Sequence, residues 1–116
     1  MKINKIVRNK IFLSNEEIMD INLDIKTKYD LKEDMDIESI YDEISYEASL
    51  AKALYYLSLR ARTEEELRIK LGGKFRNASS IDRAVKKVRE MGYINDHDYA
   101  LSYIKNSRFG EKRAEF

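Results

Sequence analysis

Ten basic side chains between positions 60 and 89 are the most chemically suggestive feature of this sequence. They are Arg60, Arg62, Arg68, Lys70, Lys74, Arg76, Arg83, Lys86, Lys87 and Arg89. An arginine guanidinium forms paired hydrogen bonds with a carboxylate or a phosphate, and a lysine ammonium attracts the same groups as a point charge. We interpret these residues as a candidate partner-binding surface, although each one taken alone is also typical of a solubilising charge.

Side chains for catalysis or metal binding are sparse. The single histidine, His97, lies between Asp96 and Asp98 in the first turn of an expected helix, and no cysteine or second histidine exists to complete a metal site. The sequence has no glycine-rich phosphate loop, nucleophile elbow or Ser-His-Asp set. The acidic runs at 34–36 and 64–66 suit helix N-termini. We expect no catalytic residue, no metal and no cofactor, and therefore a protein that acts by binding.

Composition predicts a soluble protein rich in helix. Hydrophobic residues make up 43% and charged residues 37% of the 116 residues, and proline, which helix interiors tolerate least, is absent. The lack of cysteine suits a reducing compartment. The basic start at 1–6 has no apolar segment behind it, and no apolar run approaches the roughly 20 residues that span a bilayer. We expect a cytoplasmic protein without membrane contact.

Charge is distributed unevenly along the chain. Residues 1–50 hold 7 Lys/Arg and 12 Asp/Glu, which leaves 15 and 9 of the totals of 22 and 21 for residues 51–116. The first part is therefore acidic and the second basic. Ordinary solvated helix faces explain this pattern, and so does a basic half that meets an acidic protein groove or a nucleic acid.

Residues 1–45 are expected to form a leader of short strands and helices. Apolar residues at 3–7 and 11–13 predict two strands around a tight turn at 8–10, where Asn9 tolerates left-handed geometry. A third strand is predicted at 18–21 and a short helix from Asn22 to Leu31. Asp36 is expected to cap another helix. Its apolar stripe would be Ile37, Ile40, Tyr41 and Ile44.

Residues 46–94 predict three helices that pack into one unit. The first spans about 46–60, and its expected buried stripe is Leu50, Ala51, Leu54, Leu57 and Ser58, flanked by Ala53 and Ala61. The alanines at 48, 51, 53 and 61 are expected to let another helix pack closely. Thr63 and Glu66 have the spacing of a capping box for the second helix, which ends at Gly72-Gly73. That helix turns Leu67 and Leu71 inward, and Phe75 folds back onto the core.

The third helix is expected at about 80–91, capped by Ser79 or Ser80. Its buried stripe would be Ile81, Ala84, Val85, Val88 and Met91. Arg83, Lys86 and Lys87 then lie on the opposite, exposed face. Gly92 ends the helix, and Tyr93 and Ile94 cover its exit.

A further helix is predicted at about 96–108, with Asp96 as its cap. Its inner side chains would be Tyr99, Ala100, Tyr103 and Ile104. This stripe matches that of the 46–60 helix, and an arginine-containing link follows both, which indicates the start of a second copy of the three-helix unit.

Two segments resemble the RecX family. One is similar to the family's Tyr-Leu-Ser and Arg-x-Arg-Ser/Thr-Glu-x-Glu-Leu pattern: Ala53-Leu54-Tyr55-Tyr56-Leu57-Ser58-Leu59-Arg60-Ala61-Arg62-Thr63-Glu64-Glu65-Glu66-Leu67. The other is similar to its Leu-Gly-Tyr-Leu/Ile-x-Asp segment: Val88-Arg89-Glu90-Met91-Gly92-Tyr93-Ile94-Asn95-Asp96, followed by Tyr99-Ala100 and Tyr103-Ile104. Their order and spacing match the family's first repeat. Gly72-Gly73-Lys74-Phe75 departs from the family's Lys-Gly-Phe or Lys-Gly-Tyr link, which leaves the role of Lys74 undecided.

The resemblance implies a mainly α fold in three parts. Residues 1–45 would be the leader, 46–94 the first three-helix repeat, and 95–116 the start of a second, truncated repeat. RecX proteins are expected to contain three such repeats in tandem. We therefore expect this chain to be the N-terminal portion of such a protein.

The resemblance also implies a function. RecX proteins lie in the groove of the RecA filament on single-stranded DNA and limit its recombinase and coprotease activity in DNA repair and the SOS response. The ten basic residues would then contact acidic RecA surface or filament DNA. One alternative is a helical module that binds DNA independently of RecA, with an affinity that falls steeply with salt. Another is a scaffold that self-associates through the unfinished repeat.

Overall fold

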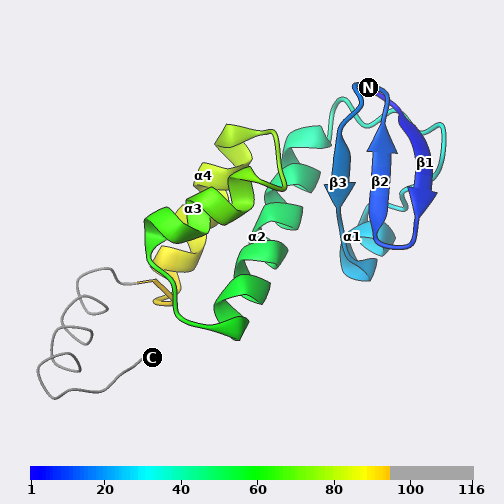
Figure 1. The fold of residues 1–116 in the computed structure, drawn as a ribbon. Coiled ribbons are helices and arrows are strands. Elements are labelled where there is room, and N and C mark those ends of the chain that lie inside the picture. Colours follow the sequence, from blue (N-terminus) through cyan, green and yellow to red (C-terminus); the bar gives the residue numbers. More distant parts are fainter. Residues whose placement is uncertain (95–116) are drawn as a thin grey trace, which may run out of the picture.

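The computed structural model describes residues 1–94, which form a small sheet followed by helices (Figure 1). The strands are β1 (Ile3–Val7), β2 (Lys10–Leu13) and β3 (Ile18–Asp20). The helices are α1 (Leu23–Lys28), α2 (Tyr41–Leu59), α3 (Glu64–Gly72) and α4 (Ala78–Glu90). Figure 1 shows the sheet and α1 at one end of α2, with α3 and α4 along its other side. The predicted fold class, mainly α with a small β leader, is confirmed.

The sheet is antiparallel in the order β1-β2-β3 and buries one face. Ile11 and Leu13 alternate with less buried neighbours along β2, as the two-residue period of a strand requires. They join Ile25 of α1 and Ile44 of α2 in a single apolar core. The tight turn between β1 and β2 is confirmed, but its left-handed residue is Arg8, with φ of 55°, and not Asn9.

The region before α2 differs from the prediction. Asp36 does not cap a helix: its backbone pairs with Lys2 at the sheet, and its carboxylate accepts a hydrogen bond from the Glu38 N–H at 3.0 Å. The Ile37 N–H donates to the Met1 carbonyl at 2.9 Å, so this segment is attached to the sheet. The helix therefore begins only at Tyr41, and the two helices expected on either side of position 45 are one continuous α2.

The predicted buried stripe of α2 is also wrong, although two of the alanines expected to allow close packing, Ala48 and Ala53, are buried. Its buried face carries small side chains, chiefly Ser45, Ala48, Ser49 and Ala53, together with Ile44 and Tyr56. Leu50, Ala51, Leu54 and Leu57 are only half-buried, and Ser58 is exposed. Small side chains allow another helix to approach closely. Close packing therefore selects the small face, and the leucines flank the contact.

The capping box of α3 is confirmed. The Thr63 hydroxyl accepts from the Glu66 N–H at 3.1 Å, and the Glu66 carboxylate accepts from the Thr63 N–H at 3.0 Å. Leu67 and Leu71 are fully buried, α3 ends at Gly72, and Phe75 packs onto the core as expected.

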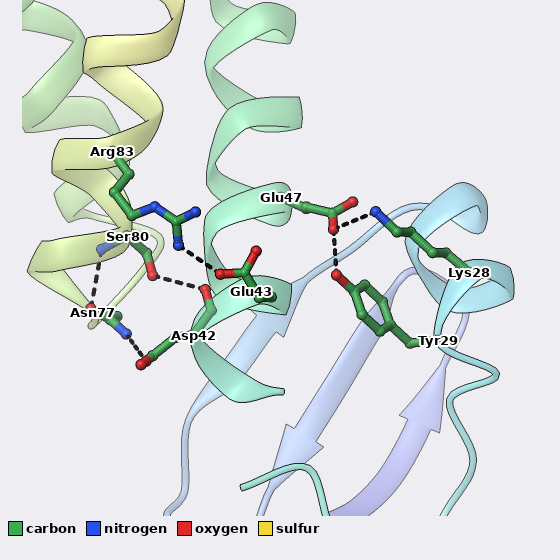
Figure 2. Close-up of polar contacts among 8 residues, drawn as sticks. All are labelled: Lys28, Tyr29, Asp42, Glu43, Glu47, Asn77, Ser80 and Arg83. Atoms are coloured by element: carbon green, nitrogen blue, oxygen red, sulfur yellow. Dashed lines mark hydrogen bonds and ion pairs between the residues drawn. The ribbon is translucent and has the colours of Figure 1, made fainter. Parts of the chain in front are cut away.

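The cap of α4 is Asn77 rather than Ser79 or Ser80. Its amide oxygen accepts from the Ser80 N–H at 3.1 Å, while its amide nitrogen donates to the Asp42 carboxylate at 3.0 Å (Figure 2). The buried Ser80 hydroxyl donates to the Asp42 carbonyl at 3.3 Å. Asn77 is the preferred cap because its one amide side chain both caps α4 and attaches α4 to α2.

The inner face of α4 is largely as predicted, with Ile81, Ala84, Val85 and Val88 buried. Met91 is 44% exposed because the helix ends at Glu90 and the chain then turns at Gly92, with φ of 84°. Ile94 is buried beyond that turn as expected, whereas Tyr93 is exposed.

A buried acid joins the leader to α2. Glu17, in the β2–β3 turn, is 1% exposed and accepts a hydrogen bond from the Tyr41 hydroxyl at 2.6 Å. Burial raises the pKa of Tyr41, and the adjacent Glu17 carboxylate raises it further.

Several expectations concern residues outside those described. They are the 96–108 helix with Asp96, Tyr99, Ala100, Tyr103 and Ile104, the position of His97 in its first turn, and the start of a second repeat at 95–116. The division into leader and repeats stays a prediction. Across residues 1–94, no helix is both long enough and apolar enough to cross a bilayer.

Replacing Ser49 by alanine is expected to stabilise the fold. The Ser49 hydroxyl is fully buried and has no hydrogen-bond partner among residues 1–94. Removing it relieves an unpaired polar group and improves helix propensity, so the free energy of unfolding should rise by about 0.5–1 kcal/mol. Urea denaturation measures this change. Ser58→Ala, at an exposed site near the helix end, is the control and should change stability by at most roughly 0.5 kcal/mol. A loss of stability in Ser49→Ala would contradict the packing described.

Candidate partner-binding surface

Six of the ten predicted basic residues lie on α3 and α4, and the other four lie in the links before and after α3. α2 and α4 run in the same direction, because the first turn of α4 contacts the first turn of α2 through Asn77, Ser80 and Asp42 (Figure 2). α3 runs in the opposite direction to α4: its start, at Glu64, meets the end of α4, and its later residue Arg68 meets Asp82 near the start of α4.

Two of the ten predicted cations link α3 to α4. Arg68 pairs with Asp82 at 2.9 Å and with Glu64 at 3.2 Å, and Arg89 pairs with Glu64 at 2.6 Å. Burial raises the pKa of Glu64, but the hydrogen bonds from Arg89 and Arg68 outweigh it, so this pKa lies below its usual value. These arginines stabilise the helix pair and are only partly available to another molecule.

Three further arginines also have contacts within the chain. The Arg83 guanidinium pairs with Glu43 at 2.9 Å (Figure 2). It also lies 4.1 Å from the centre of the Tyr46 ring. Arg76 donates to the carbonyls of Asn15 and Glu16, both at 3.0 Å, and so joins the α3–α4 link to the sheet. Arg62 is 8% exposed, donates to the Tyr56 carbonyl at 3.3 Å, and stacks over the Tyr56 ring.

Four of the ten cations surround one depression of about 490 Å³ between α2 and α3. We call it the basic hollow; it is lined by Tyr56, Arg60, Arg62, Glu66, Ile69, Lys70, Gly73 and Lys74. Arg60 lies 3.7 Å from its single acid, Glu66, and Lys70 lies 5.6 Å from the centre of the Tyr56 ring. An excess of positive charge thus surrounds a partly apolar floor that includes the exposed Ile69.

Lys86 and Lys87 lie apart from this hollow, on the exposed side of α4 as predicted. Neither has an ion-pair partner within residues 1–94, so both ammonium groups are open to solvent there. The structure therefore brings together only part of the predicted set.

Sequence reasoning missed a second group of cations. Asp20, at the end of β3, pairs with Lys10 at 2.5 Å, Lys52 at 3.2 Å and Lys74 at 3.9 Å. Burial raises the pKa of Asp20, but hydrogen bonds from Lys10 and Lys52 lower it below its usual value overall. The four residues lie on β2, β3, α2 and the α3–α4 link, so no local pattern could reveal this cluster.

An apolar depression of about 460 Å³ lies at the end of α2 farthest from the sheet. Leu54, Leu57, Ser58, Ala61 and Tyr93 line it. Three of these residues belong to the stripe that the sequence assigned to the core. Within residues 1–94, no cluster of three His, Cys, Asp or Glu side chains has the arrangement of a metal site.

The described residues form a mainly helical domain with a short β leader and a surface rich in basic side chains. No family model matches the chain. Proteins named regulatory protein RecX do match: that of Geobacillus sp. (strain WCH70) is 31% identical over 96 residues, covering 78% of this chain and 35% of that protein. Its counterpart in Listeria monocytogenes serotype 4a (strain HCC23) is 31% identical over 103 residues, covering 84% and 38%.

A solved structure, described as the crystal structure of regulatory protein RecX, has the same fold. It superimposes with a TM-score of 0.59 and 22% identity, over 95% of this chain and 60% of that one. The chain belongs to the RecX family. It spans well under half the length of the Geobacillus and Listeria relatives.

Acid should weaken the α3–α4 contact through Glu64. A carboxyl whose pKa is lower in the folded protein adds stability above its unfolded pKa, here near its ordinary value of 4.5, and that stability is lost as pH falls through the lower folded pKa. Glu64→Gln should therefore cost about 1 kcal/mol near neutral pH and progressively less below about pH 4.5. Denaturation with urea at a series of pH values measures the difference.

Glu65→Gln is the matched control. Glu65 occupies the same first turn of α3 and has the same favourable interaction with the helix dipole, but it has no ion pair within residues 1–94. An equal loss in both variants would assign the effect to the dipole and contradict the role of Arg68 and Arg89.

Proposed function

We propose that this chain supplies part of the surface by which a RecX-type regulator binds the RecA filament on single-stranded DNA. In this role it limits recombinase and coprotease activity during DNA repair and the SOS response, and it catalyses no reaction itself. Membership of the RecX family supports a regulatory role. The basic hollow is the observation that supports contact with a protein partner.

The basic hollow has the character of a protein-binding site. It combines four cations and one acid with the ring of Tyr56 and the exposed side chain of Ile69. Arginine and tyrosine dominate the energetics of many interfaces because they combine charge or hydrogen bonding with a large apolar area. An acidic segment with an adjacent apolar side chain would complement this hollow in both respects.

The ten predicted cations contribute unequally to this proposal. Lys70, Lys86 and Lys87 are exposed and can pair with an acidic partner at little cost. Arg60 is also exposed and gives up only a long, 3.7 Å pair with Glu66. Arg68, Arg83 and Arg89 must first weaken an internal ion pair, and Arg76 must leave two backbone carbonyls. Arg62 acts from a buried position by supporting Tyr56. Lys74 is shared between the hollow and Asp20.

The double variant Arg60→Ala/Lys70→Ala should bind RecA filaments at least about tenfold more weakly than the unaltered chain, because two exposed interface cations are lost. Binding is measured by fluorescence anisotropy of the labelled chain with filaments whose DNA is fully covered by RecA. The ATPase activity of RecA on single-stranded DNA provides a second readout. Binding by this chain alone is expected to be weak, because contacts spread over several repeats add together.

Lys2→Ala/Lys32→Ala is the control, since it removes the same charge from exposed positions in the leader. Equal losses of affinity in the two double variants would show that binding depends on net charge and not on the basic hollow. No binding at high micromolar concentration, with no effect on the ATPase, would refute the proposal. Equal affinity for filaments and for naked DNA, with the same loss in Arg60→Ala/Lys70→Ala, would favour the RecA-independent alternative.

A further inference from the structure

Three lysines from separate elements converge on one carboxylate between the sheet and α2. Lys10 of β2, Lys52 of α2 and Lys74 of the α3–α4 link all have their ammonium groups within 3.9 Å of Asp20. Two adjoining depressions of about 350 and 240 Å³ share Asp20, Ile21 and Lys52 in their walls. We call this region the lysine cleft; Arg8 borders it on one side and Tyr55 on the other.

The lysine cleft holds more positive charge than its own acid can neutralise. Within residues 1–94, the only ion-pair partner of Lys10, Lys52 and Lys74 is Asp20, and Arg8 has none. Three lysines therefore share one carboxylate, and Arg8 adds a fourth cation to the lining without an acid of its own. Lys52 is the most confined of the three lysines, with 24% of its side chain exposed. Gathering like charges in a partly desolvated place is unfavourable, so an anion that enters the cleft gains more than it would at isolated surface lysines.

The arrangement favours a phosphate over a protein carboxylate. Ammonium groups that meet around one small acceptor match a single compact anion with several oxygens. The neighbouring Tyr55 ring is 54% exposed, and the Lys52 ammonium lies 5.7 Å from its centre. Sites for single-stranded nucleic acids combine cations along the phosphate backbone with an exposed aromatic ring on which a base can stack.

We propose that the lysine cleft binds the phosphodiester backbone of a single-stranded nucleic acid. One phosphate lies among Lys10, Lys52 and Lys74, and an adjacent unpaired base stacks on Tyr55. Asp20 holds the three ammonium groups close together and also competes with the phosphate for them. A nucleic-acid strand bound there would contact both the leader and the helices. It needs no RecA, so it does not rest on the proposed function.

The test measures the anisotropy of a fluorescent oligothymidylate titrated with the full chain at fixed salt. Lys10→Gln and Lys52→Gln should each weaken binding about fivefold and reduce the slope of log K against log salt by about 0.7. Asp20→Asn should tighten binding about threefold or more, because the competing carboxylate is removed. This gain is hard to produce by damage to the fold, so Asp20→Asn and the exposed Lys10→Gln decide the test even if Lys52→Gln fails to fold.

Lys32→Gln is the matched control. Lys32 is exposed and pairs with Asp30 outside the cleft, so its loss should leave affinity within a factor of about two. Tyr55→Phe should keep the affinity, whereas Tyr55→Leu should lower it, because only the ring stacks. An Asp20→Asn variant that binds no better, or a Lys32→Gln variant that loses as much as Lys10→Gln, would overturn the proposal.

Competitors separate the sources of the anion. Oligothymidylate without label should displace the probe far better, per phosphate, than inorganic phosphate or thymidine monophosphate. Equal displacement by the monophosphate would assign the cleft to a free nucleotide and overturn the strand proposal. Equal displacement by polyglutamate at the same charge concentration would assign it to acidic protein and also overturn it. The filament test uses Arg60 and Lys70, so failure of one proposal leaves the other measurable.

Discussion

The close contact between α2 and α4 is the constraint on which the rest of the structure depends. Serines and alanines on one face of α2 let α4 lie against it, while Val85 and Val88 fill the interface from the other side. α2 also contacts β3, α1 and α3. One helix therefore fixes the positions of the leader and of both other long helices. The basic hollow and the lysine cleft each take a wall from it, so both depend on this packing.

The uneven charge of the sequence is used largely within the molecule. Acids of the first half meet bases of the second in several places: Glu43 with Arg83, and Asp20 with Lys52 and Lys74. Asp42 accepts a hydrogen bond from Asn77 at the same boundary. Attraction between the two halves thus helps the leader and helices associate. The remaining positive charge lies where acids are too few, around the basic hollow and the lysine cleft and on the outer side of α4.

Local signals predicted local structure well. The capping box at Thr63, the hairpin between β1 and β2, the stop at Gly72 and the inner stripe of α4 all depend on neighbouring residues, and the structure has them. Expectations that depended on tertiary contacts were less accurate. Asp36 has the residue type of a cap but pairs with the sheet, and Arg62 looks like a surface cation but lies buried against Tyr56. The lysine cleft arises only when four distant segments meet, which no periodicity encodes. The RecX family was recognisable because its motifs are local.

The buried carboxylate of Glu17 has a geometric consequence for the whole molecule. An acid removed from water is costly unless it is hydrogen-bonded, and here the Tyr41 hydroxyl provides a bond to one of its two oxygens. An apolar contact tolerates small shifts, whereas a hydrogen bond holds only over a narrow range of distances and angles. The bond therefore restricts how the leader can lie against the start of α2. A partner that contacts both Lys10 in the sheet and Arg60 beyond the far end of α2 must carry anionic groups at a matching spacing.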